Sequence, residues 1–105
     1  MDTSPRIPID QEKIKAFCEK WKITEFSLFG SVLSDDFRPD SDVDVLVTFE
    51  KNAPWSLFDI VDMEAELGGI LGRKIDLSER SAVESSRNRY RRSSILATAR
   101  RVYGS

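Results

Sequence analysis

The chain has 105 residues, of which 40% are hydrophobic and 32% are charged, and its formal net charge at pH 7 is −2. This composition is typical of a single globular domain over residues 1–105, and no apolar run approaches the roughly 18 residues that a membrane-spanning helix needs. The lack of histidine excludes His-liganded zinc, Ser-His-Asp hydrolysis and a histidine general base, and the single Cys18 excludes an internal disulfide.

The net charge hides an asymmetry along the chain. Residues 80–105 contain seven arginines and one acidic residue, for a net charge of +6, whereas residues 1–79 carry a net charge of −8. A basic end of this kind indicates an anionic partner, such as nucleotide phosphates, an acidic protein surface or nucleic acid. A solvated helix face is the alternative interpretation for most of these arginines, and no recognition motif supports nucleic-acid binding.

The chain begins with a predicted flexible lead-in and one amphipathic helix. Prolines near the N-terminus disfavour a helix in residues 1–8. Residues 9–21 then place apolar side chains on one helical face, with Asp10 available as the N-cap. That face comprises Ile14, Phe17, Cys18 and Trp21. We interpret Cys18 as a small core residue because no histidine is present to activate its thiol.

Two strands with an acidic loop between them follow the helix. Residues 26–29 are predicted as a strand that ends at Gly30-Ser31, and residues 43–50 as a second strand. Side chains alternate along a strand, so Asp42 and Asp44 project from the same face. Two neighbouring carboxylates repel each other unless a cation lies between them, and oxygen ligands suit Mg²⁺. Taken alone, this pair could instead be two acids at the end of a strand.

The Gly30-Ser31 turn offers the groups that bind a phosphate. It provides backbone without a Cβ obstruction, a backbone N–H and a hydroxyl donor. Ser31 could equally be a simple turn residue, and its functional interpretation depends on the downstream aspartates. A phosphate-binding turn beside a dicarboxylate metal site predicts metal-assisted nucleotidyl transfer.

The remaining elements are predicted as a helix, a strand and a final helix. The second helix begins at Ser56 with a capping box to Asp59 and ends at Gly72. Residues 73–78 are predicted as a strand that presents a third carboxylate, Asp76, on the face opposite to its apolar neighbours. We expect this strand to be central, where an aspartate is disfavoured unless it has a function. Residues 93–103 have helical spacing, whereas residues 81–92 remain unassigned.

The motifs LFGS at 28–31, RPDSDVDVLVTFE at 38–50 and LGRKIDL at 71–77 resemble those of the DNA polymerase β-like nucleotidyltransferase superfamily. With the tail RNRYRRSSILATARRVY at 87–103, the whole chain is similar to its minimal branch, the MNT or MntA-type antitoxins. The resemblance implies an α+β fold, a small mixed sheet packed by helices in the order α-β-β-α-β-α, which is also the order predicted from the residues. It covers nearly the whole chain, from about residue 14 to residue 103.

The resemblance also implies an activity and its residues. Such proteins transfer AMP from ATP to a hydroxyl acceptor, which for MNT antitoxins is a tyrosine of a HEPN ribonuclease toxin. By this similarity, Gly30 and Ser31 would bind the β- and γ-phosphates. Asp42 and Asp44 would hold two Mg²⁺ ions, and Asp76 would share one ion and help to deprotonate the acceptor. We therefore expect a cytoplasmic, Mg²⁺-dependent protein adenylyltransferase that assembles with a HEPN toxin.

The family loop after Gly-Ser commonly carries an arginine where this chain has Ser34, followed by Asp35 and Asp36. Arg38 or arginines of the tail could replace it on the phosphate side. If none does, the alternative function is a non-catalytic antitoxin that neutralises a HEPN ribonuclease by occlusion. A third alternative, transfer to a small molecule or an RNA end, is disfavoured because superfamily members with those acceptors carry large additional domains.

Three aromatic residues have competing interpretations. We interpret Trp21, Trp55 and Phe58 as packing residues rather than platforms for base stacking, although Trp55 lies in a predicted loop and could contact a partner.

Overall fold

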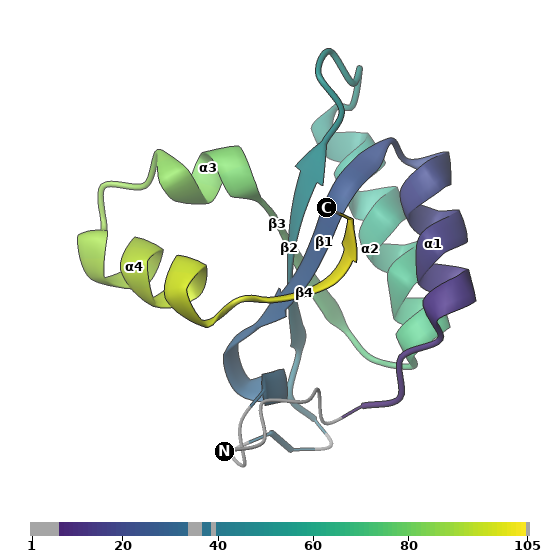
Figure 1. Cartoon of the computed structure of the whole chain (residues 1–105). Coiled ribbons are helices and arrows are strands. Elements are labelled where there is room, and N and C mark those ends of the chain that lie inside the picture. The colour runs from purple at the N-terminus through teal and green to yellow at the C-terminus, as the bar shows by residue number, and fades with distance from the viewer. Residues whose placement is uncertain (1–6, 34–36, 39, 105) are drawn as a thin grey trace.

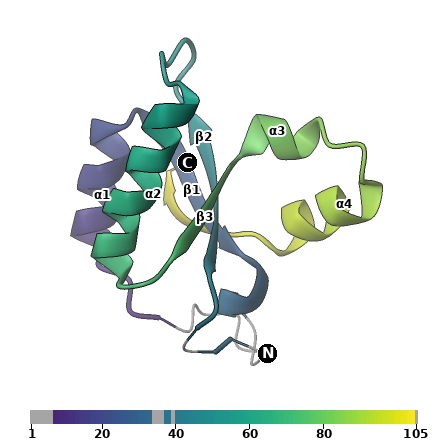
Figure 2. The same ribbon diagram turned by 180° about the vertical axis from the view of Figure 1, so that it is seen from behind.

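A computed structural model describes residues 7–33, 37–38 and 40–104. The chain forms a four-stranded mixed sheet between two layers of helices (Figures 1 and 2). In chain order the elements are α1 (Gln11–Lys20), β1 (Ile23–Phe29), the 3₁₀ helix η1 (Gly30–Leu33), β2 (Val43–Phe49), α2 (Leu57–Leu71), β3 (Ile75–Glu79), α3 (Arg80–Glu84), α4 (Arg89–Thr98) and β4 (Arg100–Gly104). The predicted lead-in at residues 1–8 lies mostly outside the described residues.

The sheet has the strand order β3-β2-β1-β4. Strand β1 is antiparallel to both β2 and β4, whereas β2 and β3 are parallel. Helices α1 and α2 cover one face, and α3 and α4 lie on the other (Figure 1). Strand β3 is therefore an edge strand, and the prediction that Asp76 lies in a central strand is wrong. The backbone N–H of Leu77 on this edge donates a hydrogen bond of 2.9 Å to the Glu64 carboxylate of α2.

The predicted helix boundaries are largely confirmed by their caps. The Asp10 carboxylate accepts hydrogen bonds from the backbone N–H groups of Glu12 and Lys13, which fixes the start of α1. At the start of α2, the Asp59 carboxylate accepts from the backbone N–H of Ser56 at 2.8 Å. Gly72 ends this helix in the left-handed conformation, at φ 66°.

The final helix, predicted over residues 93–103, is confirmed over residues 93–98 and wrong beyond them. Helix α4 starts earlier, where the Asn88 side chain accepts from the backbone N–H of Arg91, and it ends at Thr98. Ala99 has extended backbone, and residues 100–104 form β4 against β1. The apolar spacing of this segment fits a helix, but pairing with β1 satisfies backbone groups that an open sheet edge would leave exposed. The predicted element order therefore lacks both α3 and β4.

The main core lies between the sheet and the layer of α1 and α2. Its fully buried side chains include Ile14, Phe17, Phe26, Met63 and Leu67. A smaller apolar cluster lies on the other face, beneath α3 and α4, and consists of Phe29, Leu46, Val83 and Ile95. No described helix is both long enough and apolar enough to cross a bilayer.

Candidate active site

Gly30 lies at the end of β1, where the chain turns into η1 and approaches β2. Its φ of 76° is in the left-handed region that favours glycine. A Cβ at this position would also overlap with the Oδ2 atom of Asp44. Glycine is thus required here for two reasons, backbone conformation and close approach to a carboxylate. Ser31 follows as the second residue of η1 and is half-buried.

The parallel pairing of β2 and β3 brings two predicted site residues together. Asp44 and Asp76 are direct register partners, so both project from the sheet face that carries Leu46. Asp42 lies one residue before β2, two positions from Asp44. Asp42 and Asp76 are exposed, whereas Asp44 is half-buried. The structure therefore places all three predicted carboxylates at one end of the sheet, beside Gly30.

The electrostatics of Asp44 reflect this grouping. Burial raises the pKa of the Asp44 carboxyl, and the neighbouring charges of Asp76 and Asp42 raise it further. The Arg91 guanidinium of α4 acts in the opposite direction and lowers the pKa of the same group. Negative charge is thus concentrated around Asp44, and a cation bound there would relieve the repulsion.

A metal site was predicted from these carboxylates. Their hard oxygen donors match the ligand preference of Mg²⁺. Across the described residues, however, no set of three or more His, Cys, Asp or Glu side chains is arranged to hold a metal ion as it stands. The roles of Asp42, Asp44 and Asp76 as metal ligands therefore remain predictions that rest on donor chemistry and mutual repulsion.

A cavity of about 870 Å³ opens on the glycine side of the carboxylates. Besides Gly30 and Leu33 of η1, it is lined by the end of α4 and the start of β4, including Thr98, Arg100 and Arg101. We call it the glycine-side cavity. The departure from the family loop at Ser34, Asp35 and Asp36 lies outside the described residues. The tail arginines that were predicted to replace the family arginine include two that line this cavity.

Arg38 was the other predicted replacement. Its backbone carbonyl accepts a hydrogen bond of 3.0 Å from the Arg73 Nη1 atom, and its side chain is exposed. It does not line the glycine-side cavity. Among the residues that the structure describes, the cations that line the cavity beside Gly30 are Arg100 and Arg101 of β4.

Comparisons with known proteins agree with this geometry. The family model described as "Nucleotidyltransferase domain" matches residues 11–102. The chain belongs to this family. A "Protein adenylyltransferase MntA" of Thermococcus cleftensis is 35% identical over 71 residues, which cover 68% of this chain and 70% of that protein. The predicted similarity to minimal nucleotidyltransferases is confirmed.

Two solved structures share the fold. One, described as a toxin–antitoxin with AMP-PNP, has a TM-score of 0.70 at 17% identity and covers 92% of this chain and 75% of that chain. The other is a tri-AMPylated Shewanella oneidensis HEPN toxin in complex with an MNT antitoxin. Its TM-score is 0.60 at 16% identity, with coverage of 90% of this chain and 70% of that chain. At these identities the likeness shows the nucleotidyltransferase fold.

The structure of this nucleotidyltransferase domain tests whether Trp21, Trp55 and Phe58 are packing residues. The Trp55 indole N–H donates to the Trp21 carbonyl at 2.7 Å, and the two rings pack edge to face at 5.1 Å. Their prediction as packing residues is confirmed. The prediction for Phe58 is wrong, because its side chain is 84% exposed. Its position near the helical stripe of α2 suggested packing, and only the tertiary structure shows that nothing described covers it.

Two further predictions concern Cys18 and Arg91. Cys18 is fully buried, and burial, assisted by the charge of Glu19, raises the pKa of its thiol to about 12. The thiol therefore stays neutral and unreactive, as predicted for a core residue. Arg91 is one of the arginines in residues 80–105 for which the sequence left two interpretations open, an anionic partner and a solvated helix face. The structure shows that its charge acts on Asp44, a relation between segments 47 residues apart that local spacing does not reveal.

Proposed function

We propose that this chain transfers AMP from ATP to a hydroxyl of a partner HEPN toxin and acts as its antitoxin. The observation that carries the proposal is the grouping of Asp42, Asp44 and Asp76 beside Gly30. Family membership supports nucleotidyl transfer, and the relatives named above as protein adenylyltransferase and as an MNT antitoxin support a protein acceptor.

In the proposed reaction, the acceptor hydroxyl oxygen attacks the α-phosphorus of ATP. The bond from the α-phosphorus to the bridging oxygen breaks, and pyrophosphate leaves. Gly30 and Ser31 bind the β- and γ-phosphates, with Arg100 and Arg101 as neighbouring cations. Asp76 accepts the proton of the acceptor hydroxyl, which we take to be a tyrosine.

Asp42 and Asp44 would hold two Mg²⁺ ions, one of them shared with Asp76. When bound, such ions stabilise both the entering and the leaving oxygen of an in-line displacement. The protein itself then contributes positioning and charge neutralisation, with no covalent intermediate. The glycine-side cavity, at about 870 Å³, is within the size range of sites for small molecules and cofactors.

The test uses the purified chain, α-³²P-labelled ATP, MgCl₂ and the HEPN-domain protein of the adjoining reading frame. We expect label on that protein with the wild-type chain and at least a hundredfold less with Asp42→Asn. We expect the omission of MgCl₂ to reduce labelling by the wild-type chain to a similar extent. The proposal fails if no label is transferred, or if wild type and variant label equally.

The non-catalytic alternative makes a different prediction for cells. If Asp42→Ala/Asp44→Ala still protects cells from the HEPN protein as well as the wild type does, occlusion is sufficient and the catalytic proposal is wrong. We expect protection to be lost while the variant remains folded, as measured by circular dichroism.

A further inference from the structure

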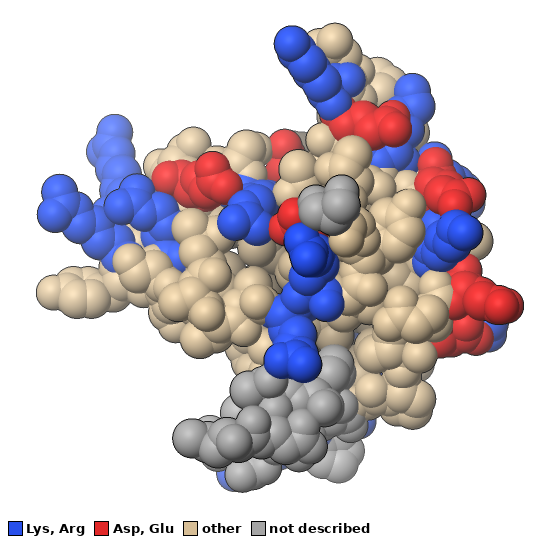
Figure 3. Space-filling view, viewed as in Figure 1, with Lys and Arg blue, Asp and Glu red and all other residues tan. Residues whose placement is uncertain are grey.

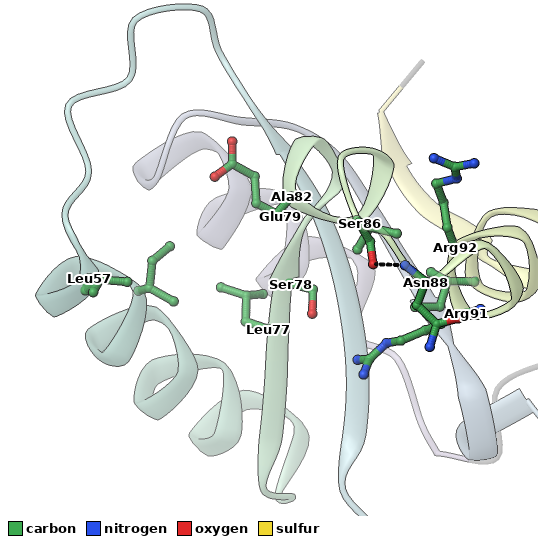
Figure 4. A pocket seen from close by; sticks show the side chains of 12 residues that line it. Leu57, Leu77, Ser78, Glu79, Ala82, Ser86, Asn88, Arg91 and Arg92 are labelled. Atoms are coloured by element: carbon green, nitrogen blue, oxygen red, sulfur yellow. Dashed lines mark hydrogen bonds between the residues drawn. The ribbon is translucent and has the colours of Figure 1, made fainter.

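A second cavity, of about 560 Å³, lies between α2 and α4 on the β3 side of the sheet. Figure 4 shows α2 on one side of it, β3 along its floor, and α4 on the other side. Its apolar lining comes from Leu57, Leu77, Val83 and Ile95. We call this cavity the α2–α4 groove. Nothing in the proposed function uses it.

The groove has an exposed apolar lip at the start of α2. Leu57, which lines the groove, is 82% exposed. Phe58 and Val61 continue this apolar surface outside the groove, at 84% and 61% exposed. Large apolar side chains that gather beside a cavity are typical of a surface that a partner covers.

The opposite wall of the groove is cationic. Arg91 and Arg92 line it, and the exposed Arg87 and Arg89 lie just outside. Figure 3 shows basic side chains gathered over the α3–α4 loop and the start of α4, at the left of the view. Within the described part of the chain, none of these four arginines forms a salt bridge with a carboxylate, whereas Arg80 forms two. Glu79 also lines the groove, so the basic charge is concentrated on the α4 side.

The groove runs along β3, the strand that carries Asp76. Ser78 lines it and lies two residues after Asp76 on the same face of β3. In Figure 4 the Arg91 side chain extends from α4 into the groove, towards β3, while Arg92 points away from it. The glycine-side cavity, in contrast, is bounded by η1 and β4. One cavity therefore borders Gly30, and the other borders Ser78 of β3 and Arg91, whose charge acts on Asp44.

We propose that the α2–α4 groove binds the hydroxyl-bearing segment of the acceptor protein, a segment with an apolar side chain flanked by acidic residues. The apolar side chain packs against Leu57 and Leu77, and the acidic residues face Arg91. This inference rests on the proposed function, because it assigns the Asp76 side to the acceptor and the Gly30 side to the nucleotide. The cationic wall suits either an acidic protein segment or RNA, and the exposed apolar lip favours the protein segment, because RNA offers no apolar side chain to cover it.

The test compares two exposed residues of α2. Leu57→Glu places a carboxylate inside the groove, whereas Ala65→Glu places one on the same helix, outside both the groove and its apolar lip. Both positions are exposed, so neither variant should unfold. Affinity for the HEPN-domain protein is measured by calorimetry in an Asp42→Asn background without nucleotide. We expect Leu57→Glu to weaken binding at least about tenfold and Ala65→Glu to change it less than about threefold.

A second measurement separates acceptor from nucleotide. Affinity for AMP-PNP with MgCl₂ should be the same in the wild type and in Leu57→Glu. The inference is wrong if the nucleotide affinity falls and the protein affinity does not, because the groove then holds the nucleoside. It is also wrong if both glutamate variants bind the HEPN-domain protein equally. Since binding is measured without turnover, failure of AMP transfer leaves this result interpretable.

The cationic wall is tested by a second matched pair. Arg91→Gln removes the charge that extends into the groove, and Arg89→Gln removes one outside it. We expect only Arg91→Gln to weaken binding of the HEPN-domain protein severalfold and to reduce its dependence on salt. Equal effects of the two variants would overturn the assignment. It would also be overturned if a single-stranded RNA bound the wild type more tightly than the HEPN-domain protein does, and if Leu57→Glu abolished that RNA binding.

Discussion

The two faces of the sheet differ in how they use their side chains. The face under α1 and α2 is filled by an apolar core, in which Ile14, Phe26, Met63 and Leu67 are fully buried. The face towards α3 and α4 has a small apolar cluster, three carboxylates and two cavities. One face therefore provides most of the stability, while the other retains repulsive charge and open space. This division allows a domain of 105 residues to tolerate a group of mutually repelling carboxylates, the candidate active site.

The largest expected effect tests the contribution of the two apolar clusters. Leu67→Ala removes a fully buried side chain from the main core and should lower the free energy of unfolding by about 3 kcal/mol. Ile95→Ala in the smaller cluster should cost about 2 kcal/mol or less, because the groove beside it allows the surroundings to relax. Urea denaturation measures the free energy of unfolding of the wild type and of both variants. An equal or larger loss for Ile95→Ala would contradict the comparison.

A smaller effect on stability, with a large effect on transfer, is expected at Gly30. Gly30→Ala introduces a Cβ at positive φ and against the Asp44 carboxylate, so it should cost about 1–2 kcal/mol and abolish AMP transfer. Gly69→Ala is the matched control, because no atom lies within 4 Å of its added Cβ and it lies inside α2. That variant should gain about 0.5–1 kcal/mol and remain active. Thermal unfolding and the labelling assay together distinguish the two.

The smallest expected change in stability is a gain at Asp44. The pKa of this carboxyl is raised in the folded protein, so the folded state binds the proton more tightly than the unfolded state. Its ionised form therefore destabilises the metal-free protein at neutral pH, and the penalty disappears as pH falls through the raised pKa towards 3.8. Asp44→Asn should raise the Tm at pH 7 by a few degrees and abolish transfer.

Two controls sharpen this prediction. The difference in Tm between Asp44→Asn and the wild type should shrink as the pH falls towards 3.8, because the wild-type carboxyl takes up its proton over that range. MgCl₂ should raise the Tm of the wild type more than that of Asp44→Asn, because a ligand that binds only the folded state stabilises it. A lower Tm for Asp44→Asn in metal-free buffer at pH 7 would show that the carboxylate is stabilising. That result would contradict the view that the sheet face towards α3 and α4 carries destabilising charge.

Local sequence signals predicted the elements whose ends carry their own chemistry. The capping side chains of Asp10 and Asp59 and the left-handed Gly72 fixed the limits of α1 and α2 within one or two residues. The alternation around Asp44 gave the correct strand faces. The last segment was predicted wrongly because its apolar spacing suits a helix, while the free edge of β1 provides hydrogen bonds that only the folded sheet offers.

The sequence by itself determined which residues are candidates for the site: a glycine-serine turn, two aspartates spaced two positions apart, and a third aspartate on a later strand. The oxygen-donor chemistry of these aspartates is intrinsic to the side chain. Only the tertiary structure decided what surrounds them. It placed β3 at the edge of the sheet and left Leu57 and Phe58 exposed. It also placed the Arg91 guanidinium where its charge lowers the pKa of Asp44. The physical reason is that these relations depend on strand order and helix docking, which arise from contacts between distant segments and leave no periodic trace in the chain.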